Sequence, residues 1–125
     1  INKTTNESSA IIKLQYGKNS ILFMGDAGKK KEHLLIKKYG NFIDCDILKV
    51  GHHGSKTSTS NQLLKIVNPK YSIISSGINN AYQFPDSSVI NRIRNIKSII
   101  CRTDIQGTLL FELDGEKIKF LNTDN

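Results

Sequence analysis

Residues 45–55 read Cys-Asp-Ile-Leu-Lys-Val-Gly-His-His-Gly-Ser, a stretch that joins an apolar run to a dense polar loop. The first six residues are apolar except for one Asp and one Lys, which predicts a largely buried strand. The glycines that follow allow a sharp change of direction. We therefore expect His52 and His53 to lie in a loop directly after a buried strand.

The two histidines are the strongest chemical signal in the chain. Imidazole is the commonest metal-binding side chain and a natural acid or base near neutral pH. The flanking glycines let backbone amides approach an anionic oxygen. This density of polar groups predicts a catalytic or metal-binding role for His52 and His53, and the alternative is two loop histidines that only form hydrogen bonds.

A second candidate lies upstream, where residues 22–26 read Leu-Phe-Met-Gly-Asp. Gly25 and Gly28 allow the backbone to turn near a ligand, so Asp26 is a candidate metal ligand, although an Asp here also suits a turn or a helix cap. A strand-helix-strand connection would return Asp26 and His52 to one sheet edge. A carboxylate bridging two divalent ions, with imidazoles completing their shells, activates water and stabilises a phosphoryl or acyl transition state.

Hydrophobic periodicity and turn signals predict the element order ββαβαβαβββ. A capping-box pattern starts the second helix, Pro85-Asp86 starts the third, and Asp114-Gly115 marks a hairpin turn. This order predicts one domain of the α/β class, or α+β in some schemes, with helices laid on a sheet. Strands are expected at residues 9–16, 20–24, 45–50, 71–75, 98–102, 108–113 and 117–121, and helices at 29–39, from 59 and from 85.

Composition sets limits on the class of protein. With 125 residues, 38% hydrophobic and 23% charged, the chain fits one globular domain, and no apolar run reaches the roughly 18–20 residues of a membrane span. Cys45 and Cys101 lie in apolar strands and predict buried thiols. The chain starts without Met or a signal-peptide pattern, so we expect that an upstream part has been removed.

The charge balance is basic, with 18 Lys and Arg against 11 Asp and Glu and a net charge of +7. Such a balance favours polyanionic partners such as nucleic acid. A genome composition that enriches Lys, Asn and Ile together would produce the same excess. Both explanations stay open on composition alone.

Several segments together resemble the metallo-β-lactamase-type domain of ComEC competence proteins and their free-standing relatives. The match spans nearly the whole chain. A Gly-His-His-Gly-Ser segment after a strand ending in Gly-Asp is specific to this branch, whereas Gly-Asp alone occurs across the superfamily. The matching segments are residues 6–14, 22–26 and 46–58, Ser-Ser-Gly at 75–77 with Asn79 or Asn80 and Tyr82, and Arg-Thr-Asp at 102–104 with Gly107.

The resemblance implies an αββα sandwich of which this chain supplies the C-terminal half, as a mixed sheet with helices on one face. It also implies two divalent ions, Zn or Mn, and hydrolysis of a phosphodiester or related ester. Asp26 would bridge the ions, and His53 or His52 would supply the late metal-binding histidine. In ComEC proteins the domain accompanies a DNA-uptake channel, which implies the extracytoplasmic face of a bacterial membrane; a free-standing relative would be cytoplasmic or secreted.

Two features depart from the family pattern. The upstream His-x-His-x-Asp-His motif, which supplies several metal ligands, is absent from these residues, so the chain alone is expected to be a poor catalyst without the upstream half of its domain. Phe84 stands where the pattern has a His before Pro85, so a metal or substrate role at that position is lost. His33, in a Lys-rich helix, is not expected to replace it.

Two further groups have competing interpretations. Ser55, Lys56 and Thr57 could bind a phosphate through hydroxyls and backbone amides ahead of a helix, whose dipole favours an anion, or could simply cap that helix. Asp104 could orient a histidine or pair with Arg102.

Three functions compete. The first is a metal-dependent hydrolase domain that acts on phosphodiesters, with DNA the preferred substrate class. The second is a non-catalytic nucleic-acid-binding or channel-associated module of the same fold, which would suit Phe84 and the truncated ligand set. The third is a hydrolase of small esters or cell-wall substituents.

Overall fold

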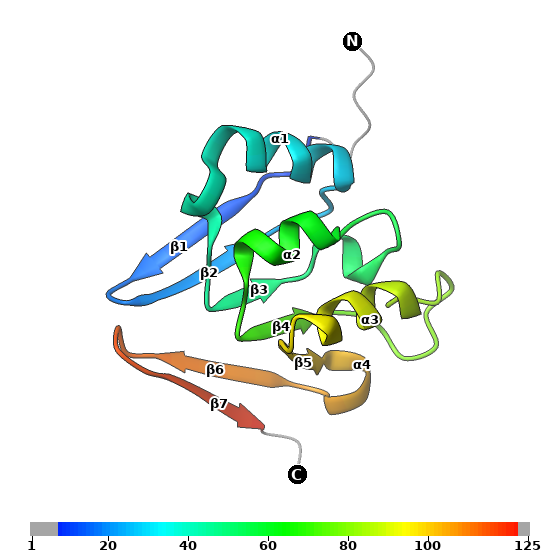
Figure 1. The fold of residues 1–125 in the computed structure, drawn as a ribbon. Coiled ribbons are helices and arrows are strands. Elements are labelled where there is room, and N and C mark those ends of the chain that lie inside the picture. Colours follow the sequence, from blue (N-terminus) through cyan, green and yellow to red (C-terminus); the bar gives the residue numbers. More distant parts are fainter. Residues whose placement is uncertain (1–7, 123–125) are drawn as a thin grey trace.

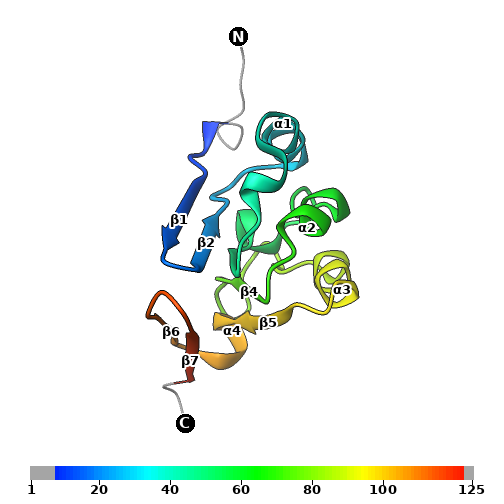
Figure 2. The same ribbon diagram turned by 60° about the vertical axis from the view of Figure 1, so that its left-hand side comes forward.

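The computed structural model describes residues 8–122, and its central feature is a five-stranded sheet with three helices on one face (Figure 1, Figure 2). The predicted α/β class and the mixed sheet are confirmed. In chain order the elements are β1 (Ile12–Tyr16), β2 (Asn19–Phe23), α1 (Lys29–Tyr39), η2 (Gly40–Ile43), β3 (Ile47–Lys49), η3 (Gly51–Gly54), α2 (Asn61–Val67), β4 (Tyr71–Ile74), α3 (Ser87–Asn95), β5 (Ile99–Arg102), α4 (Thr103–Gln106), β6 (Leu109–Leu113) and β7 (Ile118–Asn122).

The sheet has the simple strand order β1-β2-β3-β4-β5. β1 and β2 form an antiparallel hairpin, while β2, β3, β4 and β5 run parallel, with Leu22 beside Leu48 and Ile73 beside Cys101. The parallel pairs are joined through α1, α2 and α3, because parallel neighbours need crossover connections. The carboxyl ends of β2, β3 and β4 therefore meet along one edge of the sheet.

The core lies between the sheet and the three helices. Alternate strand residues such as Leu22, Leu48 and Ile74 face it, because successive side chains of a strand point to opposite faces. They pack against the apolar sides of α2 and α3, to which Leu64 and Ile93 contribute. Both cysteines are buried and unpaired, as predicted.

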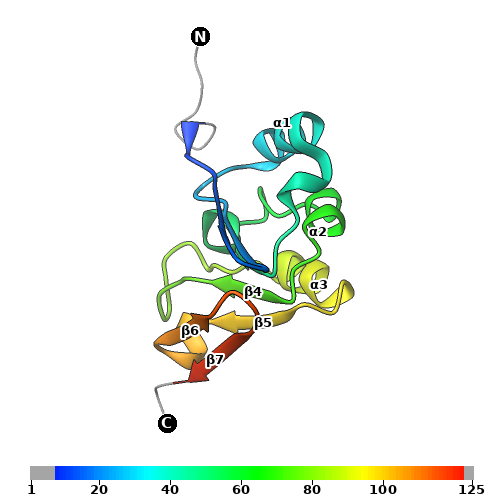
Figure 3. The same cartoon turned by 90° about the vertical axis from the view of Figure 1, so that its left-hand side faces the viewer.

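The other face of the sheet is only partly covered. Ile12, Leu14 and Phe23 alternate onto it and remain exposed. The β6–β7 hairpin packs against this face near β4, where the rings of Tyr71 and Phe111 lie 5.2 Å apart. Figure 3 shows the hairpin beside β4 and β5. Between residues 8 and 122 we find no helix with the length and apolarity that a bilayer crossing requires.

Some local predictions were wrong. The sequence of residues 29–39 suggests a short amphipathic helix with Leu34 on its apolar side, but in α1 Leu34 is half-exposed and the most buried residue is Glu32. Helix α3 starts at Ser87, because Asp86 is its N-cap and accepts a hydrogen bond from the Ser88 amide. The short helices η2, η3 and α4 were not predicted. Residues 6 and 7 of the segment expected to match at 6–14 lie outside the described residues.

Candidate metal and phosphodiester site

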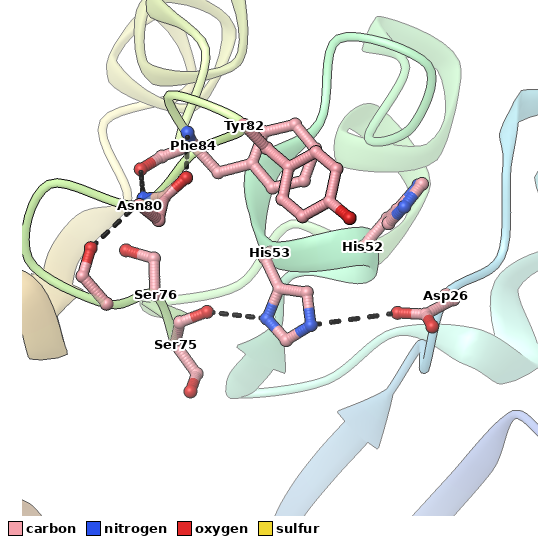
Figure 4. A pocket seen from close by; sticks show the side chains of 9 residues that line it. Asp26, His52, His53, Ser75, Ser76, Asn80, Tyr82 and Phe84 are labelled. Atoms are coloured by element: carbon pink, nitrogen blue, oxygen red, sulfur yellow. Dashed lines mark hydrogen bonds and ion pairs between the residues drawn. The ribbon is translucent and has the colours of Figure 1, made fainter.

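A pocket of about 620 Å³ opens where β2, β3 and β4 end (Figure 4). It brings together the aspartate after β2, both histidines after β3 and the loop after β4. The predicted meeting of Asp26 with the histidine pair at one sheet edge therefore occurs in the structure. Its lining residues are Asp26, His52, His53, Ser75, Ser76, Gly77, Asn80, Tyr82 and Phe84.

Asp26 is placed by a sharp turn after β2. Gly25 has φ +57°, and a Cβ there would lie 3.0 Å from the Ala10 carbonyl oxygen, so the position favours glycine for two reasons. The Asp26 amide donates to Ser9 Oγ over 3.3 Å. The carboxylate is 48% exposed and is free to take a ligand from the pocket side.

The histidine pair occupies a left-handed turn within η3. His52 and His53 have φ values of 50° and 53°, a region that costs a residue with a Cβ about 1–2 kcal/mol. The His52 amide donates to the Gly25 carbonyl oxygen over 2.8 Å, which ties this turn to the one that carries Asp26. Strained backbone of this kind persists only where its surroundings hold it, and it gathers at functional sites.

The hydrogen bond of His53 determines which of its ring nitrogens is available. Nδ1 lies 2.7 Å from the Ser75 carbonyl oxygen, and because a carbonyl only accepts, Nδ1 carries the proton. In the neutral imidazole, Nε2 then carries the lone pair. It lies 4.0 Å from Asp26 Oδ1, and Figure 4 shows the ring between the two partners. This is the tautomer and orientation of a metal-binding histidine.

His52 is held differently. Its ring packs edge-on against Phe84 with centroids 5.6 Å apart, and Phe84 in turn stacks with Tyr82. Its Nδ1 is buried and has no hydrogen-bond partner within residues 8–122. His52 therefore forms the pocket wall beside Phe84, whereas His53 presents a nitrogen to Asp26.

The donor set is incomplete in the described part of the chain. No group of three or more His, Cys, Asp or Glu side chains there could hold a metal ion. His33 lies on α1 and does not line this pocket. Asp26 and His53 thus supply two donors of the kinds that Zn²⁺ and Mn²⁺ accept, and a closed site needs about four.

Other predicted site residues lie outside the pocket lining. Ser55 Oγ and Thr57 Oγ1 hydrogen-bond to each other over 2.9 Å, and Lys56 between them is exposed. Asp104 binds Arg102 through both carboxylate oxygens, at 3.0 and 2.6 Å, which is the alternative to orienting a histidine. The guanidinium of Arg102 lowers the pKa of Asp104 through these hydrogen bonds.

Sequence reasoning did not assign site roles to the loop after β4. Ser75 acts through its backbone carbonyl, which no side-chain pattern reveals. Asn80 shapes the loop, because its amide group donates to the Gly77 and Phe84 carbonyls and accepts from the Phe84 amide. The sequence did carry one signal for this loop: the segments that match the family include Ser75 to Gly77, Asn80 and Tyr82.

The family assignment agrees with this geometry. Residues 1–78 match the model of the metallo-beta-lactamase superfamily, and the chain belongs to that superfamily. Three curated proteins similar to the chain carry names that refer to recombination, to competence or to the ComE operon.

The chain is 43% identical over 107 residues to Recombination protein 2 of Haemophilus influenzae, covering 86% of this chain and 13% of that protein. It is 39% identical over 114 residues to Competence protein ComA of Neisseria gonorrhoeae (91% and 16%), and 37% identical over 106 residues to ComE operon protein 3 of Bacillus subtilis (85% and 14%). The chain thus spans only about one seventh of the length of these relatives.

Proposed function

We propose that this chain carries part of a divalent-metal hydrolase site, with Asp26 and His53 as metal ligands and a phosphodiester as substrate. The observation that carries the proposal is the alignment of His53, with Nδ1 donating to Ser75 and Nε2 lying 4.0 Å from Asp26 Oδ1. The superfamily match supports the metal chemistry. When bound, such ions activate water and stabilise charge on a phosphoryl group.

The separation of the two donors is compatible with one shared ion. Donor atoms that each lie about 2.0–2.2 Å from an ion are at most about 4.4 Å apart. Because the two donors leave the coordination shell unfilled, we propose that further ligands come from polypeptide beyond these residues. On this proposal the chain is the C-terminal portion of a larger domain, and the exposed apolar sheet face near Ile12 and Phe23 belongs to its interior.

DNA is the proposed substrate class, in a protein with a role in competence. The names of Competence protein ComA and Recombination protein 2 point to processes that handle DNA. The net charge of +7 suits a polyanion, whose counterions are released when Lys and Arg neutralise its phosphates.

A second candidate is a nucleic-acid-binding module without catalysis. Phe84 favours it, because an aromatic ring packed on His52 occupies the pocket wall and offers no donor to a metal. The two candidates predict different metal contents for the protein that contains this chain.

The test uses that full-length protein. Its metal content after desalting is measured by plasma mass spectrometry, and hydrolysis of single- and double-stranded DNA is assayed, for the natural sequence and Asp26→Asn. Asp44→Asn, which changes the same charge at an exposed carboxylate, is the matched control. We expect Asp26→Asn to lose metal and at least about 100-fold in hydrolysis, a magnitude typical of catalytic electrostatics.

Two results would count against the proposal. Unchanged metal content and hydrolysis in Asp26→Asn would remove Asp26 from the site. DNA binding by a natural protein that holds no metal and cleaves nothing would establish the binding module instead.

A further inference from the structure

Two consecutive peptide groups just after the histidine turn are held by a buried carboxylate. Glu32 on α1 is 1% exposed, and its two oxygens accept from the backbone amides of Thr59, over 2.5 Å, and Ser60, over 2.9 Å. Ser58 and Thr59 are themselves fully buried. Burying a carboxylate is costly unless hydrogen bonds satisfy it, and these two amides give each oxygen of Glu32 a donor.

Arg92 on α3 binds the same two peptide groups through their carbonyl oxygens. Its Nε donates to Thr59 over 2.8 Å and one terminal nitrogen donates to Ser58 over 3.1 Å. In a trans peptide the N–H and C=O point in opposite directions. The Ser58–Thr59 and Thr59–Ser60 peptide groups are therefore each held between the anionic Glu32 and the cationic Arg92, so that both charges are compensated by aligned dipoles.

The clamped segment is connected to the histidine turn. Ser58 Oγ donates to the Gly51 and Ser55 carbonyl oxygens, at 2.9 and 3.0 Å, and these two residues bracket the turn. The Ser55 amide donates to the His52 carbonyl oxygen over 2.9 Å. A continuous set of hydrogen bonds thus runs from two helices to the left-handed turn, and the clamped Thr59 has a left-handed φ of 58° as well.

The geometry points to Glu32 and Arg92 as positioning residues that hold the histidine turn in the conformation that aims His53 Nε2 at Asp26. They touch neither ligand atom and act through the backbone of residues 51–60. The role for metal binding rests on the proposed function, whereas the conformational effect on His53 does not. A purely structural alternative exists, because the amides of Thr59 and Ser60 lie at the start of α2 and Glu32 could simply cap that helix.

The test separates these roles by measuring His53 directly in the metal-free full-length protein at pH 8. Imidazole ¹⁵N shifts report the tautomer, and amide hydrogen exchange reports the clamp at Thr59 and Ser60. The variants are Glu32→Gln, which replaces an acceptor with a donor, and Arg92→Lys, which cannot bind two carbonyls in the same fork geometry. The controls are Glu112→Gln and Arg94→Lys, which make the same changes at exposed side chains.

In the natural chain we expect a single His53 tautomer with the proton on Nδ1. Both clamp variants should give a tautomer mixture and exchange at Thr59 and Ser60 that is about 10- to 100-fold faster, as expected when a hydrogen bond to a charged group is lost. Both controls should match the natural chain. Should Glu32→Gln fail to fold, the half-buried Arg92 still allows the test through Arg92→Lys.

Faster exchange with an unchanged His53 tautomer would overturn the inference and leave Glu32 and Arg92 as helix-capping residues. Unchanged exchange and tautomer in both variants would overturn it as well. Neither readout needs a metal, so failure of the proposed hydrolase function would leave these results intact, and metal content measured on the same variants of the full-length protein would then show whether the positioning reaches the ion.

Discussion

His53 Nδ1 lies 2.7 Å from the carbonyl oxygen of Ser75, which aims the opposite nitrogen of the ring at Asp26. The imidazole belongs to the loop after β3, and its orientation is set by the backbone at the end of β4. The carboxylate it faces follows β2. The parallel strands β2, β3 and β4 together position the two donors, Asp26 and His53 Nε2. This is possible because the carboxyl ends of parallel strands lie at the same edge of a sheet.

The two histidines should differ in their effect on metal binding. In the full-length protein we expect His53→Ala to weaken metal affinity by at least about 100-fold, beyond the 10- to 100-fold that loss of an outer hydrogen-bond partner costs. His52→Ala should cost less, because the His52 ring packs on Phe84 while its backbone amide, kept in the variant, binds Gly25. Competition with a chelating dye measures both affinities, and the reverse order would make His52 the ligand.

Gly54 should tolerate no side chain. Its φ is +83°, and a Cβ there would lie 2.5 Å from Pro85 Cβ, so Gly54→Ala combines backbone strain with overpacking. We expect it to lower the free energy of unfolding by about 2–4 kcal/mol. Gly77→Ala is the matched control, because a Cβ added at Gly77 would meet no atom within 4 Å. Its effect on the free energy of unfolding should stay within about 0.5 kcal/mol. Urea unfolding of both variants measures the difference, and equal stabilities would show that the turn relaxes at no cost.

Much of the fold was predictable because its signals are local. Alternating apolar residues and Gly- or Asn-containing turns identified both hairpins, and the Asp114 side chain caps its turn by accepting from two backbone amides. Glu32 shows where such reasoning fails. Its partners Thr59 and Ser60 are 27 and 28 residues away, so the helical period of α1 alone does not reveal that Glu32 is buried.

The site was predictable to a similar extent. The meeting of Asp26 with the histidine pair follows from a strand-helix-strand connection, which composition and period reveal. The choice between His52 and His53 does not follow, because it depends on a left-handed backbone turn and on the Ser75 carbonyl of another strand. Backbone acceptors have no signature in a sequence. For Asp104 the sequence offered two partners, and the structure shows the one two residues away.

The Asp104–Arg102 pair should make stability depend on pH at the acidic end. Arg102 lowers the pKa of Asp104 in the folded state, so the stabilisation is present above the unfolded pKa of about 3.9 and is lost as the pH falls through the lower folded value. We expect Asp104→Asn to cost about 1 kcal/mol near pH 7, discounted for screening by water, and to converge with the natural chain only once the pH has fallen below the lowered folded pKa of Asp104. Urea unfolding across this range measures it.

The control for this comparison is Glu112→Gln, which removes an exposed carboxylate on β6. It should leave the difference between neutral and acidic stability nearly unchanged. A penalty for Asp104→Asn that stays constant with pH would mean that the packing of Asp104, rather than its charge, stabilises the α4 turn.

A substitution at Phe84 distinguishes the two candidate functions, because Phe84 stands where the resemblance to competence-type domains predicts a histidine. The residue lines the pocket, and its ring contacts both His52 and Tyr82. Phe84→His would add a nitrogen donor to a wall that already holds two imidazoles. We expect tighter metal retention in the full-length protein and, if the chain is a hydrolase with a weakened site, faster cleavage of DNA. Phe84→Leu controls for the loss of the aromatic ring and should give neither gain.

Tighter metal binding by Phe84→His without DNA cleavage would show that the histidine restores a metal ligand but that the module binds DNA without hydrolysing it. No change in metal binding would mean that the side chain at position 84 does not reach the ion.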